Sequence, residues 1–316
     1  MKVYRSLEEF EPLANAVVTQ GTFDGVHIGH QKILDRVRNI AAQKGGESVL
    51  LTFFPHPRMV LQPDDNTLRL LSTTEEKIER LRKAGIDHLL VIPFTLEFSR
   101  QSSMQFVRDV LVNTIGVKTL VIGYDHRFGK NREGSMEDLH ELGQVYGFEV
   151  EEIPPQDIDD VTVSSTKIRN ALQESEVDVA AKFLGYHYPI SGKVVAGNSL
   201  GKTIGFPTAN IVVEETYKLI PNDGVYAVRV IVDGEIYGGM ANMGKQPTFD
   251  NRNHAFEVHI FDFNADIYGR IIRVEFVAHL RSEMKFSGVD ALIAQLKQDE
   301  NTARNVLTID ENRKLA

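Results

Sequence analysis

The segment from Gly21 to His30, GTFDGVHIGH, combines three glycines with two histidines in a pattern suited to binding phosphate. Its glycines let an anion approach the backbone without obstruction by side chains. His27 and His30 lie where a helix is expected to begin, so backbone N–H groups, the helix dipole and two imidazoles converge there. Such imidazoles can stabilise charge that develops on the phosphates of a nucleotide, and we predict that both are catalytic. The other loop positions expected to contact phosphate are Gly21, Phe23, Asp24 and Gly29.

Two other interpretations of this loop stay open from its residues alone, a structural turn and a metal-binding histidine pair. A plain turn would not need two imidazoles beside three glycines. A metal site would need at least a third ligand.

A second glycine-rich segment, GNSLGKT at residues 197–203, resembles a Walker A loop only in part. That motif has four residues between its glycines, and this segment has three. A Walker loop must also begin a helix, whereas Gly205 and Pro207 stand where the first helical turns would be. We therefore exclude a P-loop.

Glu257 is a candidate general base in a predicted strand. The alternation of the strand directs its side chain away from the face formed by Phe256, Val258 and Ile260. A carboxylate there can accept the proton of a primary hydroxyl that attacks a phosphate. The alternative, an ordinary outward-facing glutamate, fits the residues equally well.

The elements that must position the first loop alternate along the first 155 residues. Apolar runs at 16–19, 48–54, 88–93, 119–123 and 148–153 are typical of strands buried on both faces. Helical stretches between them are expected to end at Gly45, Gly85, Gly116 and Gly147. Capping boxes are predicted at Thr73 with Glu76 and at Ser102 with Gln105. This alternation predicts a doubly wound parallel sheet with ligands at the carboxyl ends of its strands.

The period of the pattern changes to two beyond residue 186. A helical stretch over about 165–184 precedes this change, and a hairpin with its turn at Asp233-Gly234 follows it. Further strands at 256–262 and 270–278 suggest a closed or nearly closed antiparallel barrel. A final helix is expected after Ser287, with an apolar face formed by Val289, Leu292, Ile293 and Leu296. We place one domain at 1–185 and a second at 186–316, an α/β architecture with a C-terminal barrel.

The composition limits the partners. A net charge of −9 argues against nucleic acid, whose binding draws on basic surface. No apolar run approaches the length of about 20 residues that a membrane span needs. The absence of cysteine excludes disulfides and thiolate chemistry and fits a reducing compartment. We expect a cytoplasmic protein, a monomer or weak oligomer, that binds small phosphorylated molecules.

The tetrapeptide His27-Ile28-Gly29-His30 resembles the signature of class I nucleotidyl transferases and aminoacyl-tRNA synthetases. In that superfamily a second motif contacts the phosphates from the other side. The candidate here is the segment 164–169, which offers hydroxyls and a guanidinium at the start of a helix. By this resemblance the phosphate-binding residues of the segment are Ser164, Ser165, Thr166 and Arg169.

The motifs together resemble those of the bifunctional riboflavin kinase/FMN adenylyltransferase family. The matching segments are 21–31, 54–57, 123–129, 164–169, 205–210, 221–226, 242–249, 256–263 and 280–286. The resemblance implies a nucleotidyltransferase domain that adenylylates FMN to FAD and a barrel domain that phosphorylates riboflavin. Two residues depart from the pattern, Phe54 where glutamate is frequent and His126 where phenylalanine is usual.

The resemblance also implies roles for individual residues. Thr208 and Asn210 would supply oxygens to the Mg²⁺ of bound ATP, and Glu257 would be the base of the kinase. Flavin contacts are implied for His56, Asp125, Arg127, Phe128 and Arg281. Nucleotide contacts in the glycine-rich flap that leads into Pro207 are implied for Gly197, Gly201, Lys202 and Gly205.

Two other functions remain alternatives. One is a synthetase-like adenylyl transfer to another substrate, which would share the first motif. The other is a non-catalytic flavin sensor, which would bind flavin without turnover.

Overall fold

The chain forms two compact units, Met1–Ser165 and Thr166–Ala316, in the computed structural model. The structure describes residues 1–65, 67–123, 128–129, 133–153, 163–197, 200–245 and 254–314.

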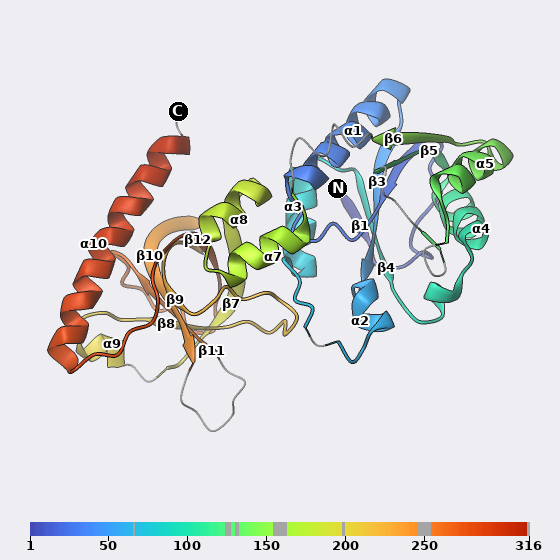
Figure 1. The fold of residues 1–316 in the computed structure, drawn as a ribbon. Helices are drawn as coiled ribbons and strands as arrows, with labels where there is room; N and C mark the ends of the chain where they lie inside the picture. The colour runs from blue at the N-terminus through green and yellow to red at the C-terminus, as the bar shows by residue number, and fades with distance from the viewer. Residues whose placement is uncertain are drawn as a thin grey trace. The chain divides into compact units, whose positions relative to one another are not determined.

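A six-stranded parallel sheet forms the centre of the first unit (Figure 1). Its spatial order is β1-β4-β3-β2-β5-β6. The strands are β1 (Lys2–Tyr4), β2 (Ala16–Gln20), β3 (Glu47–Phe54), β4 (His88–Pro93), β5 (Val117–Gly123) and β6 (Glu149–Ile153). The five predicted strands are confirmed. The short edge strand β1, which pairs with β4, was not predicted because three residues show no periodicity.

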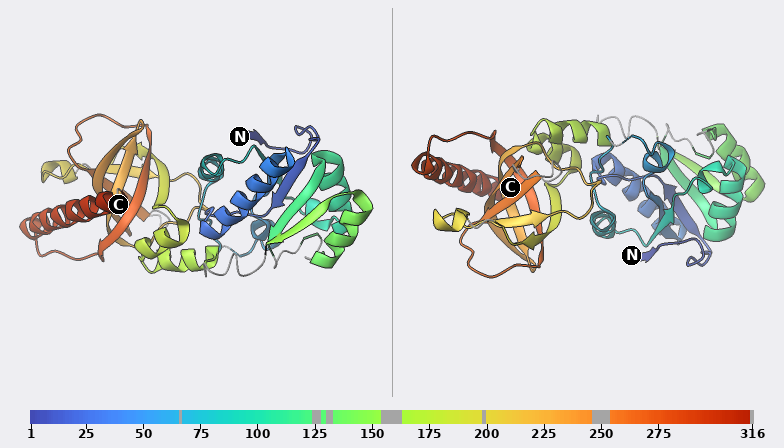
Figure 2. Two further views of the ribbon diagram at one scale, coloured as in Figure 1. Left: turned by 90° about the horizontal axis from the view of Figure 1, so that it is seen from above. Right: turned by 90° about the horizontal axis from the view of Figure 1, so that it is seen from below.

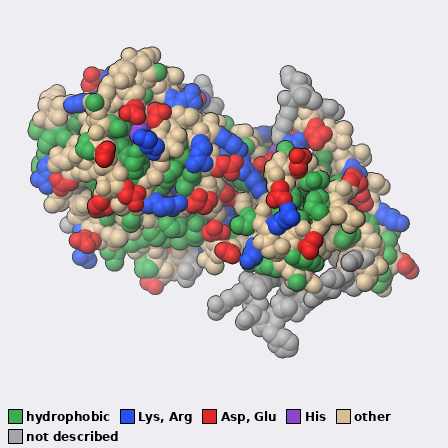
Figure 3. Space-filling model, turned by 180° about the vertical axis from the view of Figure 1, so that it is seen from behind, with side chains coloured by type: hydrophobic (Ala, Val, Ile, Leu, Met, Phe, Trp, Pro, Cys, Tyr) green, Lys and Arg blue, Asp and Glu red, His purple; other side chains and the backbone are tan. Residues whose placement is uncertain are grey.

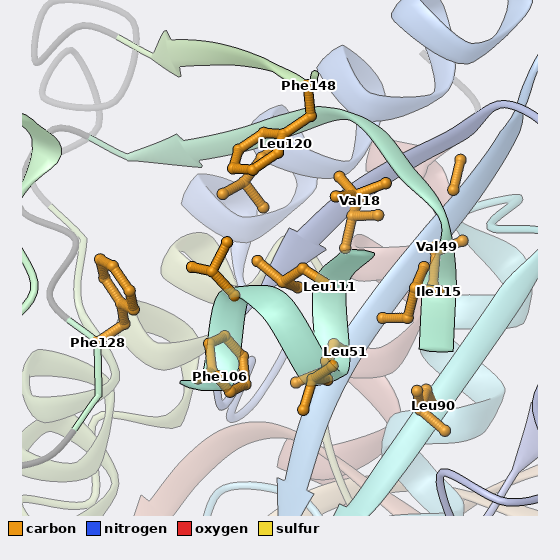
Figure 4. Close-up of a cluster of buried hydrophobic side chains, with 14 of the residues drawn as sticks. Val18, Val49, Leu51, Leu90, Phe106, Leu111, Ile115, Leu120, Phe128 and Phe148 are labelled. Atoms are coloured by element: carbon orange, nitrogen blue, oxygen red, sulfur yellow. The ribbon is translucent and has the colours of Figure 1, made fainter. Parts of the chain in front are cut away.

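Helices cover both faces of this sheet, as the predicted doubly wound fold requires. One face packs on α1 (Ile28–Lys44) and α3 (Thr74–Lys83), and the other packs on α5 (Met136–Tyr146) and the π-helical segment η2 (Phe106–Ile115). The shorter helices are α2 (Pro57–Leu61), the 3₁₀ turn η1 (Phe98–Arg100) and α4 (Ser103–Gln105). Figure 4 shows part of the second face, with Val18, Val49, Leu51, Leu90, Phe106, Leu111, Ile115, Leu120 and Phe148.

The local signals for helix ends are confirmed. Gly45, Gly116 and Gly147 each end a helix in the left-handed conformation, and Gly85, also left-handed, directly follows Ala84, the C-cap of α3. Both predicted capping boxes are present, at Thr73 and at Ser102. A third box, in which Ser135 caps α5 with Asp138, was not predicted.

A closed barrel with the order β10-β11-β8-β7-β12-β9 forms the centre of the second unit, which confirms the second half of the predicted fold. All pairs in it are antiparallel. Its strands are β7 (Tyr188–Val195), β8 (Ala209–Val212), β9 (Gly224–Val232), β10 (Glu235–Lys245), β11 (His254–Ile260) and β12 (Ile271–Arg281). The predicted hairpin turn is confirmed, because Asp233 and Gly234 both have positive φ between paired Val232 and Glu235.

Helix α10 (Val289–Lys314) runs along the outside of the barrel (Figure 2). Ile293 and Leu296 pack on the barrel as predicted, together with Ala303 and Leu307. Val289 was wrongly assigned to this face and is 59% exposed, because it is the first residue of the helix.

The stretch 165–184 is two helices, α7 (Ser165–Gln173) and α8 (Val177–Leu184), and not the single helix that we expected. Ser175, with φ of 64°, breaks the helical path between them. Helix α8 packs on β7 and β12, so the compact unit that contains the barrel begins at Thr166, whereas the sequence places the boundary at 185/186.

Candidate functional site

The glycine-rich loop joins the carboxyl end of β2 to the first turn of α1, where the sequence predicted it. The Gly21 N–H donates to the carbonyl of Leu51 on the neighbouring strand, at 3.0 Å. Two non-glycine residues in the loop, Phe23 and Val26, have positive φ of 45° and 40°. Such a conformation persists only when surrounding contacts stabilise it. The conformation of the loop is therefore stabilised by contacts with the rest of the fold.

The two histidines lie together at the start of α1. His27 is the N-cap, and its Nδ1 accepts a hydrogen bond from the His30 N–H at 3.3 Å. The imidazoles stack with a centroid distance of 3.7 Å, and the ring of Phe23 lies 4.7 Å from that of His30. His27 is 7% exposed, so its imidazole is largely enclosed by the protein.

Burial, together with the nearby charges of His27 and Lys77, lowers the pKa of His30 well below its ordinary value of 6.5. The folded protein therefore holds this imidazole neutral, while the unfolded chain takes up a proton near pH 6.5. A proton bound more tightly by the unfolded state makes stability rise with pH.

We expect His30→Gln to reduce the loss of stability on acidification, because this variant has no imidazole to protonate on unfolding. Denaturant unfolding of wild type and variant at pH 7.5 and at pH 5.5 measures the difference. The wild type should lose more stability than the variant between these two values. An equal loss in both proteins would contradict a depressed pKa at His30.

Asp24, which we predicted to contact phosphate, is turned toward the protein. It is 2% exposed, and its carboxylate accepts hydrogen bonds from the N–H groups of Leu71 and Ser72. Its side chain thus fixes the loop that precedes α3. A Cβ on Gly21 would lie 3.0 Å from the ring of Phe23, and one on Gly29 would lie 3.3 Å from the ring of His27, so both positions are closely packed.

The second motif is in contact with the first through one of its hydroxyls. The Ser165 Oγ donates to the carbonyl of Asp24 at 3.1 Å, so the loop and the start of α7 are joined. Ser164 is exposed directly before this helix. Thr166 and Arg169 follow on α7 in the second compact unit.

The predicted flavin contacts of the first unit are only partly described by the structure. His56 caps α2, with its Nδ1 accepting from the Arg58 N–H at 3.2 Å. Phe128 is 5% exposed and belongs to the hydrophobic core, next to Phe106. This burial gives Phe128 a packing role and does not favour a flavin contact. Asp125, His126 and Arg127 lie outside the described residues.

The barrel carries a cavity of about 310 Å³ that brings together the residues predicted from the kinase-like motifs. The predicted residues that line it are Gly201, Thr208, Asn210, Glu257 and Arg281. They come from separate parts of the second unit, between residues 201 and 281. The cavity therefore joins motifs that the sequence could only place one by one.

Strand register explains how these side chains meet. Glu257 on β11 pairs directly with Asn210 on β8 and with Asn242 on β10. Asn242 pairs with Val225 of β9, which in turn pairs with Arg281 of β12. Directly paired residues share one face of a sheet, so five strands place a row of side chains on the cavity wall. The predicted orientation of Glu257 is confirmed, since Phe256, Val258 and Ile260 are buried on the other face.

The flap glycines approach these side chains closely. A Cβ on Gly197 would overlap the side-chain amide of Asn210. A Cβ on Gly201 would overlap the carbonyl of Phe206 and lie 3.5 Å from the Thr208 hydroxyl. Gly205 has φ of 85° and open space around it. The structure does not describe the side chain of Lys202.

Among the residues of this site that were not predicted, three polar ones fix its geometry or lie beside Glu257. Asn242 lies directly opposite Glu257 and could have been found from the alternation along its strand. His259 donates from Nδ1 to the carbonyl of Pro207 at 2.7 Å and so fixes the turn before Thr208.

The third residue is Asp299 of α10, whose side chain is 4% exposed. Its carboxylate accepts hydrogen bonds from the Arg281 Nε at 3.0 Å and from a terminal nitrogen of the same guanidinium at 2.7 Å. Nothing in the local sequence links a residue of this helix to a strand eighteen positions earlier.

In the described parts of the chain, the histidine pair has no further side chains placed to complete a metal site. No group of three or more His, Cys, Asp or Glu side chains there is arranged to hold a metal ion. On the face shown in Figure 3, Lys and Arg side chains are interspersed with Asp and Glu. This mixture gives no support to a nucleic-acid surface on that face.

Comparisons with known proteins agree on two adjoining domains. The model of the FAD synthetase family matches residues 10–167, and that of the riboflavin kinase family matches 184–307. A bifunctional riboflavin kinase/FMN adenylyltransferase from Listeria monocytogenes is 43% identical over 92% of each chain. The protein of that name from Escherichia coli is 36% identical over 96% of this chain and 97% of its own.

A solved structure of similar fold comes from Streptococcus pneumoniae. It is described as a macrolide-efflux protein, is 35% identical, and superposes with a TM-score of 0.87 over 96% of this chain and 98% of its own. In the parts of the present chain that the structure describes, no helix has both the length and the apolar character to cross a bilayer.

Proposed function

The chain belongs to the bifunctional riboflavin kinase/FMN adenylyltransferase family, and we propose that the glycine-rich loop with its second motif catalyses one of the two reactions and that the barrel catalyses the other. The enzyme phosphorylates riboflavin with ATP to give FMN, then adenylylates FMN to FAD and releases pyrophosphate. These matches cover both halves of the chain, so neither adenylyl transfer to another substrate nor a non-catalytic sensor is favoured.

The kinase reaction is assigned to the cavity of the barrel. Glu257 accepts the proton of the primary hydroxyl of riboflavin as that oxygen attacks the γ-phosphorus of ATP, and ADP leaves. Arg281, held in place by Asp299, offers its guanidinium to the flavin or to a phosphate. The observation that carries this assignment is the cross-strand row that places Glu257 between Asn210 and Asn242 in one cavity.

Thr208 and Asn210 fit the role of magnesium ligands. They offer a hydroxyl and an amide oxygen on the wall of the same cavity, and Mg²⁺ prefers oxygen ligands with retained waters and phosphates. The flap backbone at Gly197 and Gly201 lies against these two side chains, where no Cβ would fit. When bound, the metal ion neutralises charge on the phosphates of ATP.

We expect Gly197→Ala to reduce riboflavin phosphorylation by about tenfold or more. The added methyl displaces the Asn210 amide, and displacement of a positioned group by about 1 Å can cost up to about 10²-fold in rate. Initial rates of FMN formation at varied ATP and Mg²⁺ measure the effect. Gly288→Ala is the matched control, because a Cβ there meets open space. Equal rates in the two variants would contradict a role for the flap.

The adenylylation is assigned to the glycine-rich loop of the first unit. The FMN phosphate attacks the α-phosphorus of ATP and pyrophosphate leaves, so no protein nucleophile is required. His27 and His30 donate hydrogen bonds to phosphate oxygens as charge develops, assisted by backbone N–H groups at the start of α1. Ser165 joins this loop to the second motif, in which Ser164, Thr166 and Arg169 are the proposed phosphate contacts.

The direct test supplies purified protein with riboflavin, ATP and Mg²⁺ and follows FMN and FAD by chromatography. FMN should accumulate before FAD, because the first product is the substrate of the second step. Absence of FMN would remove the kinase assignment. Absence of FAD when FMN is supplied would remove the adenylyltransferase assignment.

We also propose a cytoplasmic location and a monomer or weak oligomer. The substrates are small phosphorylated molecules, and the chain has no cysteine to benefit from an oxidising compartment. Sedimentation of the purified protein over a range of concentrations tests the oligomeric state.

A further inference from the structure

Lys77 is a buried lysine to which the mechanism above gives no role. It occupies the fourth position of α3, directly after the capping box of Thr73 and Glu76. Lys77 is only 9% exposed, and its Nζ donates a hydrogen bond to the carbonyl oxygen of Thr22 at 2.6 Å. An ammonium is rarely buried unless it has a partner. Here that partner is the backbone of the glycine-rich loop.

The hydrogen bond from Lys77 fixes the orientation of one peptide group. The Thr22 carbonyl accepts a second, longer hydrogen bond from the Thr52 hydroxyl, at 3.3 Å, so two donors hold it. In a trans peptide the N–H points opposite to the carbonyl, so the Phe23 N–H faces away from Lys77. Phe23 has the unfavourable φ of 45°, which requires such support.

The peptide group between Asp24 and Gly25, further along the loop, is already bound on both sides. The Asp24 carbonyl accepts from Ser165, and the Gly25 N–H donates to the Ser72 hydroxyl at 3.2 Å. The peptide between Thr22 and Phe23 differs, because its carbonyl is held from the protein interior and its N–H is directed away from Lys77. It is therefore the peptide of the loop that Lys77 orients.

Asp24 makes the buried ammonium tolerable. Burial lowers the pKa of Lys77, and the carboxylate of Asp24 opposes that change. Asp24 is held by backbone N–H groups of the segment before α3, so cation, carboxylate and loop form one connected unit. The same cation is one of the charges that keep the neighbouring His30 neutral.

We propose that Lys77 is a positioning residue for FMN adenylylation, which holds the Thr22 carbonyl so that the Phe23 N–H is presented to the phosphates of the nucleotide. This inference rests on the proposed function of the first unit. Lys77 itself touches no substrate in this arrangement. It acts through the peptide that it orients, which is a preorganised donor of the kind that stabilises a developing oxyanion.

The test uses Lys77→Met in the full chain, since methionine keeps the length and the packing of the side chain without its hydrogen bond. FAD formation from supplied FMN should fall about 10²-fold or more in kcat/KM, with the larger part in kcat. Riboflavin phosphorylation in the same preparation should stay unchanged, which reports that the unit containing the barrel is folded, and thermal unfolding reports whether the first unit is folded. Lys83→Met is the matched control, because Lys83 is an exposed lysine of the same helix.

Lys77→Arg supplies the second readout. It returns a charged donor, so we expect FAD formation within about tenfold of wild type, whereas a role in packing alone would favour methionine over arginine. The titration of His30, followed by NMR, should move to higher pH in Lys77→Met and not in Lys77→Arg, because only the first loses the cation.

The outcomes distinguish the proposed role of Lys77 from the proposed adenylyltransferase function. FAD formation by Lys77→Met within threefold of wild type overturns the role of Lys77 and leaves the proposed function intact. Failure of the wild type to make FAD overturns the proposed function instead. If Lys77→Met does not fold, a folded Lys77→Arg that has lost 10²-fold or more in activity also overturns the role.

Discussion

Glu257→Gln is expected to abolish FMN formation while conversion of supplied FMN to FAD continues at the wild-type rate. Glutamine has nearly the same shape but cannot take the proton of the riboflavin hydroxyl. Loss of a general base costs about 10²- to 10⁴-fold in rate. The cross-strand neighbours Asn210 and Asn242 can hydrogen-bond an amide as well as a carboxylate, so the barrel should stay folded. Initial rates of both reactions on one preparation measure the effect.

Two controls make the assignment of Glu257 specific. Glu235→Gln makes the same chemical change at an exposed position of β10 and should alter neither rate. Glu283 is a second carboxylate that lines the same cavity, so Glu283→Gln tests whether the base has been chosen correctly. A larger loss in Glu283→Gln than in Glu257→Gln would transfer the role to Glu283. If FAD synthesis from supplied FMN falls as much as FMN formation in Glu257→Gln, the two reactions do not have separate sites.

The sequence predicted those parts of the fold that depend on short-range rules. Strand positions followed from apolar runs, helix ends from glycines such as Gly45, and helix starts from capping boxes such as that of Thr73. The face of Glu257 followed from the alternation of one strand. All of these depend on a few neighbouring residues, so they are legible without knowledge of the tertiary structure.

The parts that the sequence could not predict depend on contacts between distant segments. Asp299 reaches Arg281 only because α10 crosses the outside of the barrel, and Lys77 reaches Thr22 from 55 positions away along the chain. The row of side chains around Glu257 follows from strand register, which no single strand specifies. The sequence also did not show that Phe128, a predicted flavin contact, is buried in the hydrophobic core. The motifs therefore predicted which segments form the candidate sites, while the residues that orient these motifs could be identified only from the structure.

His27→Asn is the second substitution with a large expected effect, and it affects the adenylylation of FMN. His27 caps α1 through its Nδ1, and its imidazole is also a proposed hydrogen-bond donor to phosphate. Asparagine is among the best N-cap residues, so the variant keeps the helix start and loses only the imidazole donor. We expect FAD formation to fall by about 10²- to 10³-fold, the cost of removing one donor to a developing charge, with riboflavin phosphorylation unchanged.

The control for this substitution is His140→Asn, which changes an exposed histidine of α5 in the same way. Steady-state rates with supplied FMN, together with thermal unfolding of each variant, separate chemistry from folding. Wild-type FAD formation by His27→Asn would show that capping is the whole function of His27, and the charge in the transition state would then fall to His30 and the backbone. If FAD formation falls while the melting temperature and the rate of riboflavin phosphorylation stay unchanged, the imidazole of His27 takes part in the adenylyl transfer itself.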